Sequence, residues 1–211
     1  MKAFVWTDWR IGLILLFLLH FCGLIGLISP ISNWFIALTP LNLLVSALLL
    51  FGNGLKAGNL NPKLALSIAL AGFLIEVAGV HTGLIFGTYK YGSTLGTKLV
   101  DVPLLIGVNW MMLTYASASS LAGLKAPNWV KSAIGALALV GMDFLIEPVA
   151  IRLDMWNWEG NSIPLENYVA WLLISFLMLQ AYYRYSSPKF NKLAAAFLLI
   201  QFLFFGILNF V

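Results

Sequence analysis

Seven stretches of about 20 predominantly apolar residues run through this chain of 211 residues, and they limit its fold more than any other feature. A helix needs about 20 such residues to cross the hydrocarbon core of a bilayer. We therefore expect an all-α, polytopic membrane bundle of about seven transmembrane helices, forming a single domain over residues 1–211. The expected spans cover residues 9–29, 35–52, 63–85, 103–122, 129–151, 167–184 and 191–211. The second stretch is short and contains Pro40, which predicts a kink or a tilt there.

The composition excludes several classes of protein. Hydrophobic residues make up 61% of the chain and charged residues only 9%, against about 25% charged residues in soluble domains. Such a chain cannot coat a water-facing surface, so a soluble enzyme and a disordered chain are both excluded. The net charge of +4 comes from scattered residues that form no basic stripe, which excludes a nucleic-acid binder. A single cysteine, Cys22, excludes an internal disulfide, a thiolate zinc cluster and an iron–sulfur site.

The distribution of Lys and Arg predicts the orientation in the membrane. Nine of these residues fall on the side of the N-terminus, and only Lys90, Lys98 and Arg152 fall on the other side. The positive-inside rule then places the N-terminus in the cytoplasm and the C-terminus outside. We expect a multi-pass protein of a bacterial cytoplasmic membrane, with its two long connections, residues 86–102 and 152–166, on the outer side.

Three carboxyl groups fall inside expected spans: Glu76, Asp143 and Glu147. An ionised carboxyl at the centre of a membrane helix costs about 2.5–3.5 kcal/mol on insertion scales, so three of them indicate a function. A rise of about 1.5 Å per residue places all three in the outer half of the bilayer. Three more polar or aromatic side chains fall near that depth: Asn109, Trp110 and, one turn nearer the surface, His81. These side chains can converge in one pocket that opens towards the two long connections.

Asp143 and Glu147 are four residues apart and therefore share one face of their helix. Two adjacent carboxyl groups in an apolar site rarely ionise together, so such a pair offers one carboxylic acid and one carboxylate. Pro148 follows directly and predicts a kink beside the pair. The structural alternatives are an ion pair with Arg152 or a hydrogen bond to a neighbouring helix. For Glu76 the alternative is a structural hydrogen bond, and for His81 it is a structural histidine near the interface.

The two long connections are rich in aromatic residues. Tyr89 and Tyr91 lie in the first, and Trp156 and Trp158 lie in the second. Interfacial belts of Trp and Tyr are common at this depth, whereas the functional alternative is an aromatic lid over the pocket. The two histidines of the chain lack the spacing of metal ligands, so we expect neither a metal nor another cofactor.

An apolar pocket at membrane depth selects a lipid-soluble substrate, and a carboxyl pair selects proton chemistry. Protonation of a trisubstituted alkene gives a tertiary carbocation, which aromatic faces stabilise. A carboxylate can then activate a water that captures the cation, or it can take a proton back, which gives isomerisation or cyclisation. The residues alone leave these outcomes open.

Two blocks of sequence resemble the integral membrane carotenoid biosynthesis proteins, a family that includes carotenoid 1,2-hydratases such as the γ-carotene 1′-hydratase. The resemblance covers most of residues 70–175. The first block is the run from Glu76 to Gly92 with Leu95-Gly96 and Val102-Pro103. The second comprises Asp143, Leu145, Glu147-Pro148, Trp156-Asn157-Trp158, Pro164, Asn167-Tyr168 and Trp171. Haloarchaeal members carry Asp-Pro where this chain has Glu147-Pro148, which keeps a carboxyl before the proline but with a longer reach.

The resemblance implies the addition of water across the 1,2 double bond of an acyclic ψ-end group on a carotenoid such as lycopene or γ-carotene, without a redox cofactor. It also implies the lipid bilayer and other enzymes of carotenoid biosynthesis as partners. The residue roles are inferred from the chemistry. We expect Asp143 and Glu147 to be the proton donor and the water-activating group, with Glu76 as the next candidate for either role. Asn109 and His81 would orient water. The pocket would be lined by Trp110, Tyr89, Tyr91, Trp156 and Trp158.

Two other classes of function fit the same residues. A lycopene-cyclase-like enzyme or an isomerase would use the same protonation but exclude water. A carotenoid- or lipid-binding protein, or a small transporter, would carry out no reaction. A path for transport would place acids across the whole bilayer, whereas these acids cluster towards one side.

Overall fold

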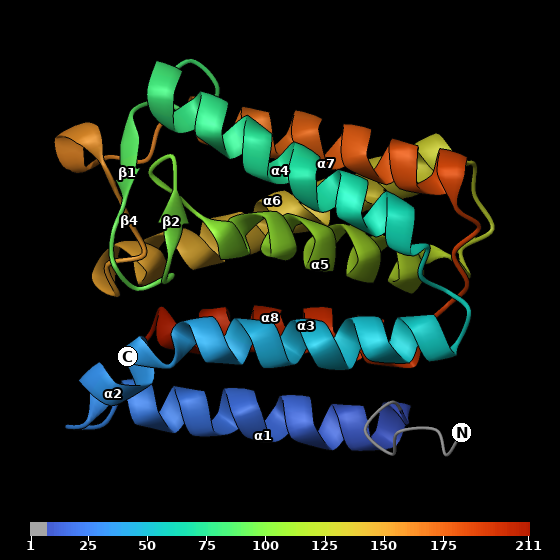
Figure 1. Ribbon diagram of the computed structural model, residues 1–211, viewed down its shortest axis with the longest axis horizontal. Helices are drawn as coiled ribbons and strands as arrows, with labels where there is room; N and C mark the ends of the chain where they lie inside the picture. Colours follow the sequence, from blue (N-terminus) through green and yellow to red (C-terminus); the bar gives the residue numbers. More distant parts are fainter. Residues whose placement is uncertain (1–7) are drawn as a thin grey trace.

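The computed structural model describes residues 8–211 as a bundle of eight α-helices with two small sheets at one end (Figure 1). Seven of the helices are long and lie roughly side by side, and the short α2 joins α1 to α3. The helices are α1 (Trp9–Leu27), α2 (Ser32–Ala37), α3 (Thr39–Lys56), α4 (Pro62–Thr82), α5 (Leu104–Leu121), α6 (Asn128–Arg152), α7 (Leu165–Tyr185) and α8 (Lys192–Leu208). The remaining elements are β1 (Tyr89–Tyr91), β2 (Lys98–Leu99), β3 (Val102–Pro103), β4 (Trp156–Trp158) and the 3₁₀ turn η2 (Glu159–Asn161). The helical fold class expected from the sequence is confirmed.

The helices form layers (Figure 1). One part of the bundle holds α4 and α7 over α5 and α6, with α4 packed on α5 and α6 packed on α7. The other part holds α3 and α8 over α1, and α5 packs against α8 to join the two parts. Small residues allow α4 and α5 to approach closely. A Cβ at Gly72 would lie 2.6 Å from the Trp110 Cβ, and one at Gly107 would lie 2.5 Å from the Ala69 carbonyl oxygen.

Local sequence signals explain where several helices begin. The Asn61 side chain accepts hydrogen bonds from the N–H groups of Lys63 and Leu64, and Pro62 occupies the first turn of α4. Asn191 caps α8 in the same way. Asparagine at the N-cap and proline in the first turn are favourable because the first N–H groups of a helix have no partner within it. These caps fix where two of the helices start.

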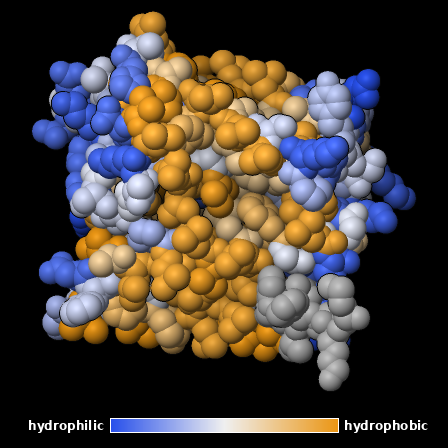
Figure 2. All heavy atoms as spheres, in the orientation of Figure 1, coloured by the Kyte–Doolittle hydropathy of each residue, from blue (hydrophilic) through white to orange (hydrophobic). Residues whose placement is uncertain are grey.

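The sides of the bundle are apolar. Leu74, Leu137 and Leu177 are each more than half exposed, although they stand in the middle of long helices. Figure 2 shows hydrophobic residues in a broad belt between two hydrophilic ends. An apolar belt of this extent is typical of a protein surrounded by lipid.

The expected number of seven spans is wrong. Each expected stretch is mostly helical, but only four described helices are long and apolar enough to cross a membrane: α1, α4, α5 and α6. The reasons are local. Polar side chains interrupt α3 and α7, including Asn42, Asn53 and Arg184, and α8 is only 17 residues long. Near Pro40 the expected second span is divided, because α2 ends at Ala37 and α3 begins at Thr39.

The two long connections are built around strands. β1 pairs antiparallel with β4, which places Tyr89 opposite Trp158 and Tyr91 opposite Trp156. β2 pairs with β3 across a tight turn. Both sheets lie at the end of the bundle that carries the C-terminus, and α1 begins at the opposite end (Figure 1). The two long connections therefore share one end, as the sequence predicts, while the side of the membrane that this end faces stays a prediction.

Candidate active site

Glu76 is held by three hydrogen bonds at the sheet end of α4. Its Oε2 accepts bonds from the hydroxyls of Tyr89, at 2.5 Å, and Tyr91, at 2.7 Å. Its Oε1 accepts a bond from the indole N–H of Trp110 on α5, at 2.9 Å. Glu76 is buried, and a buried carboxyl is stable only where such donors replace the water that it loses. This carboxyl therefore joins α4, α5 and strand β1.

The strand geometry explains why two tyrosines reach one carboxyl. Tyr89 and Tyr91 are two residues apart on β1, so both side chains point to the same face, while Lys90 points to the solvent. Burial, together with the adjacent Glu76 carboxyl, raises the pKa of Tyr89 and of Tyr91 well above the ordinary value of 10. Both phenols therefore keep their protons and act as hydrogen-bond donors at neutral pH.

Glu147 has an equivalent set of donors on the paired strand. Its Oε2 accepts bonds from the indole N–H groups of Trp156, at 3.0 Å, and Trp158, at 2.7 Å. Its Oε1 accepts a bond from the Asn167 side chain on α7, at 3.2 Å. All three partners are N–H donors, and an ionised carboxylate, which only accepts hydrogen bonds, can accept from all of them. The paired strands β1 and β4 thus each hold one buried carboxyl through two aromatic side chains.

Asp143 lies one turn before Glu147 and differs from it in one respect. Its Oδ2 accepts a hydrogen bond from the same Asn167 side-chain nitrogen, at 2.7 Å. Its Oδ1 is buried and has no hydrogen-bond partner among residues 8–211. A buried polar atom without a partner costs about 1–3 kcal/mol, so this oxygen indicates a place for a bound group. Asn167 therefore links both carboxyls and leaves one oxygen of Asp143 free to act.

A large cavity adjoins all three acids. Its volume is about 440 Å³, within the range of about 300–1,000 Å³ that is usual for small-molecule sites. The acids lie on α4 and α6, and the wall near them includes Trp110, Asn109 and the side chains of β1 and β4. The cavity continues towards α1, α3 and α8, where leucine and phenylalanine side chains form most of its wall. This shape suits a hydrocarbon chain with one end at the acids.

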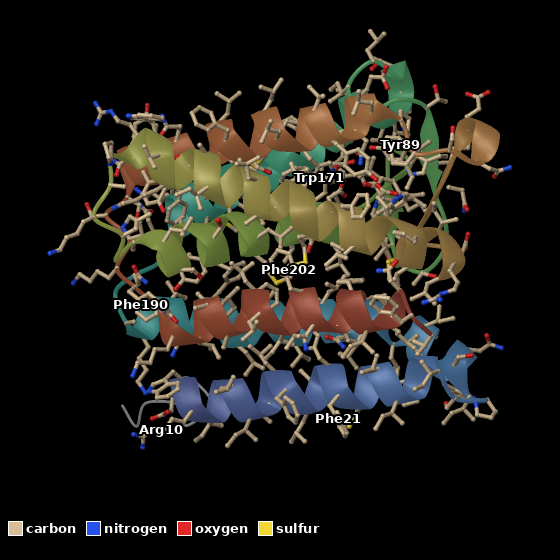
Figure 3. The ribbon with its side chains drawn as sticks, turned by 180° about the vertical axis from the view of Figure 1, so that it is seen from behind. Arg10, Phe21, Tyr89, Trp171, Phe190 and Phe202 are labelled. Atoms are coloured by element: carbon tan, nitrogen blue, oxygen red, sulfur yellow. The ribbon has the colours of Figure 1, made fainter. Side chains whose placement is uncertain are left out.

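Aromatic rings pack closely around the acids. The rings of Tyr89 and Trp158, which face each other across the sheet, have centroids 5.0 Å apart. Trp171 on α7 stacks on Trp110, with centroids 4.4 Å apart. In Figure 3, Tyr89 stands at the end of the bundle that carries the strands, and Trp171 stands nearer its middle. Aromatic rings that border the cavity can stabilise a cation that forms inside it.

Nearly all of the residues expected from the sequence meet at this cavity. The three acids, Asn109 and all five expected aromatic residues line it. His81 is the exception: its side chain is 47% exposed, and its Nε2 lies 3.9 Å from Asp101 Oδ2. The expected alternative of an ion pair with Arg152 is not present in residues 8–211, because this guanidinium donates to the carbonyl oxygens of Leu208 and Val211 instead.

Two features of the site were not predicted from the sequence. Asn167 and Trp171 belong to the resembling sequence block, but their contacts with the acids and with Trp110 had no signal in the residues alone. The second feature is the part of the cavity between α1, α3 and α8, which includes His20 and Gln201. A glutamine in the middle of an apolar helix was the available signal for it.

Comparison with known families decides the relationship. The sequence profile of the family described as carotenoid biosynthesis protein matches residues 35–211, which include all three acids and both strands of the β1–β4 sheet. The chain belongs to the carotenoid biosynthesis protein family. The resemblance noted in the two sequence blocks is therefore confirmed.

One curated relative of this carotenoid biosynthesis protein is the bisanhydrobacterioruberin hydratase of Haloarcula japonica. The two are 31% identical over 115 residues, which cover 51% of this chain and 39% of the relative. The matched segment thus spans about two fifths of the relative's length. No solved structure matches this chain.

Proposed function

We propose that this member of the family adds water across the 1,2 double bond of an acyclic ψ-end group on a carotenoid such as lycopene or γ-carotene. The similarity to a named carotenoid hydratase supports the reaction class. The cavity, with acids at one end and an apolar wall over the rest, supports a substrate that is a long hydrocarbon.

The first step is protonation of the alkene by Asp143. The O–H bond on Asp143 Oδ1 breaks, a C–H bond forms at C2 of the end group, and the positive charge develops on the tertiary carbon C1. The observation that carries this assignment is the buried Oδ1 without a partner beside the cavity. A carboxylic acid O–H group that makes no hydrogen bond to the protein is free to give its proton to a substrate.

The cavity wall stabilises the resulting cation. The rings of Trp110, Trp156 and Trp158 line the cavity, and an aromatic face attracts a nearby positive charge. The carboxyl group of Glu76 adds favourable charge at fixed geometry, because its three donors hold it in place. Preorganised groups of this kind lower the barrier without having to rearrange during the reaction.

Glu147 then activates the water. The water oxygen bonds to C1, and the proton that the water releases passes to the Glu147 carboxylate. Its Oε1 accepts only one hydrogen bond among the described residues, so it can accept another from water. The proton on Glu147 returns to Asp143, which restores both groups, and the net change is the addition of one water molecule.

The proposal is tested by expressing the protein in a bacterium that accumulates lycopene or γ-carotene and measuring pigment masses. We expect a gain of one water per modified end group. Asp143→Asn and Glu147→Gln should each lower turnover by about 100-fold or more, because each removes one proton-transfer step. Glu166→Gln is the matched control: this exposed acid lies outside the acid-bearing cavity, and the variant should keep full activity.

Four results would contradict the proposal. A product of unchanged mass with a new ring would indicate cyclisation, and a shifted double bond would indicate isomerisation. Unaltered carotenoid that stays bound through purification would indicate a binding protein. Full activity in both acid variants would exclude the carboxyl pair from the reaction, provided that membrane fractions contain both variants at the level of the unmodified protein.

A further inference from the structure

A second polar site lies in the apolar part of the cavity. His20 on α1 and Gln201 on α8 are both buried and both line the cavity, and Asn42 on α3 lines it as well. Most of their neighbours in this wall are apolar, including Leu19 and Phe204. The three polar side chains come from three different helices, none of which carries an acid of the candidate active site.

The hydrogen bonds fix the roles of His20 and Gln201. His20 Nδ1 lies 2.8 Å from the carbonyl oxygen of Leu16, which can only accept, so Nδ1 carries the proton. In the neutral ring Nε2 is then an acceptor, and the Gln201 side-chain nitrogen, at 3.0 Å, donates to it. Gln201 Oε1 accepts no hydrogen bond from the described residues. The pair therefore presents an acceptor at the wall of the cavity.

Asn42 supplies the complementary donor. Its Oδ1 accepts a bond from the Ser46 hydroxyl, at 3.2 Å, which orients the side-chain nitrogen. A Cβ added at Gly23 would lie 3.7 Å from Asn42 Nδ2 and 3.7 Å from the Phe204 ring. The Phe204 ring also packs edge-on against His20, with centroids 5.4 Å apart. Gly23 on α1 therefore lies beside both Asn42 and Phe204, and Phe204 in turn packs against His20.

We propose that Gln201, held by His20, and Asn42 form a binding site for a hydroxyl group of the isoprenoid substrate. A hydroxyl both donates and accepts, which matches one free carbonyl oxygen and one amide nitrogen. This inference rests on the proposed function for the position of the double bond at the acids. The substrate class that follows is an acyclic isoprenoid with an oxygen substituent remote from its reacting end.

Prenyl alcohols of three lengths test the hydroxyl site. Farnesol, geranylgeraniol and hexaprenol, the C30 prenyl alcohol, each carry a terminal trisubstituted alkene and a distant hydroxyl. Their methyl ethers keep the oxygen but lack the O–H donor. Binding is measured from the rise in the thermal unfolding midpoint of the full-length protein in detergent. For the best-fitting length, we expect half-maximal stabilisation at a concentration about 3- to 10-fold lower for the alcohol than for its ether.

Variants locate the preference. Gln201→Leu should reduce the ratio between alcohol and ether to about one, because it removes the acceptor while keeping a side chain of similar size. Leu19→Met changes the same wall without changing a polar group, and it should keep the ratio. Asp143→Asn should also keep the ratio, since this assay measures binding and not turnover. A failure of the proposed reaction would therefore leave this result intact.

Two outcomes would overturn the inference. One is equal binding of alcohol and ether at all three lengths in the unmodified protein, which needs no variant and so does not depend on how variants fold. The other is an unchanged ratio in Gln201→Leu, which would leave His20 and Gln201 with the purely structural role of joining α1 to α8.

Discussion

At the scale of single residues, one amide organises the proposed chemistry. The Asn167 side-chain nitrogen lies 2.7 Å from Asp143 Oδ2 and 3.2 Å from Glu147 Oε1, so it holds the two carboxyls in a fixed relation. Hydrogen bonds to carboxyl groups are among the stronger ones in proteins. We therefore propose Asn167 as a positioning residue, which holds Asp143 through Oδ2 and leaves Oδ1 without a hydrogen bond.

Replacing Asn167 should slow the reaction without weakening substrate binding. Loss of a hydrogen bond to a charged group costs about 1.5–3 kcal/mol, so we expect Asn167→Leu to lower kcat by about 10- to 100-fold with KM nearly unchanged. Asn167→Gln, which keeps the amide, should recover part of the rate. Steady-state kinetics on carotenoid in detergent micelles measures both constants. A rise in KM at unchanged kcat would assign Asn167 to substrate binding instead.

The residue scale also shows what sequence could predict. The depth of Glu76, Asp143 and Glu147 along their helices was enough to predict that they converge, and all three line one cavity. The partners of these acids were not predictable in the same way. The sheet aligns Trp156 and Trp158, which bind Glu147, with Tyr91 and Tyr89 from a segment more than 60 residues away, and no local pattern encodes that register.

At the scale of elements, the β1–β4 sheet lines the cavity near the acids and binds Glu76 and Glu147 through its aromatic side chains. Close contacts between the segment after β1 and Asp154, just before β4, form a junction that holds the sheet in place. Asp154 Oδ2 accepts hydrogen bonds from the backbone N–H and the hydroxyl of Ser93, both at 3.0 Å. A Cβ at Gly92 would lie only 2.1 Å from the Asp154 carbonyl oxygen, so this crossing requires glycine. The aromatic connections left an interfacial belt and a lid as alternatives, because strands of three residues are too short to be recognised from sequence.

The Asp154 junction predicts a pH dependence of stability. Hydrogen bonds from Ser93 lower the pKa of Asp154 below its ordinary value of 3.8. Because the folded-state pKa is the lower one, the stabilisation is complete above this ordinary value, which applies to the unfolded chain, and it is lost as the pH falls through the lower folded-state pKa. Asp154 is largely exposed, so solvent limits the effect to about 0.5 kcal/mol.

Thermal unfolding of Asp154→Asn between about pH 6 and pH 2 measures this contribution. The variant should unfold at a lower temperature than the unmodified protein at pH 6, and the difference should disappear towards pH 2. Asp101→Asn is the control, because Asp101 is exposed and has only a distant contact with His81. A difference that stays constant over the whole range would show that the Asp154 charge does not stabilise the junction.

At the scale of the whole molecule, the cavity explains why the count of spans differs from the expectation. Hydropathy windows record apolar length, and they predicted each long helix. Helix α8 falls short by its length of 17 residues, whereas α3 and α7 carry polar groups inside the bundle: Asn42 on α3 and Asn167 on α7 line the cavity. A sequence window does not distinguish a polar group that faces a cavity from one that faces lipid, so polar lining lowers the apparent hydropathy of interior helices.

The same cavity joins the two parts of the bundle. Its wall includes residues from α1, α3 and α8 as well as the acids on α4 and α6. One chain-like ligand can therefore contact both parts at once, with its reacting end at the acids. The reaction that we propose at this site is the addition of water from the medium to a carotenoid double bond.

Isotope labelling with purified protein and lycopene tests that claim most directly. In water enriched in oxygen-18, we expect one labelled hydroxyl oxygen per hydrated end group, and in deuterium oxide we expect one carbon-bound deuterium at C2 of each such end. Mass spectrometry of the extracted pigment measures both, with Asp143→Asn as the inactive reference. A product whose new oxygen does not come from water, or one that gains deuterium without gaining oxygen, would contradict hydration at this site.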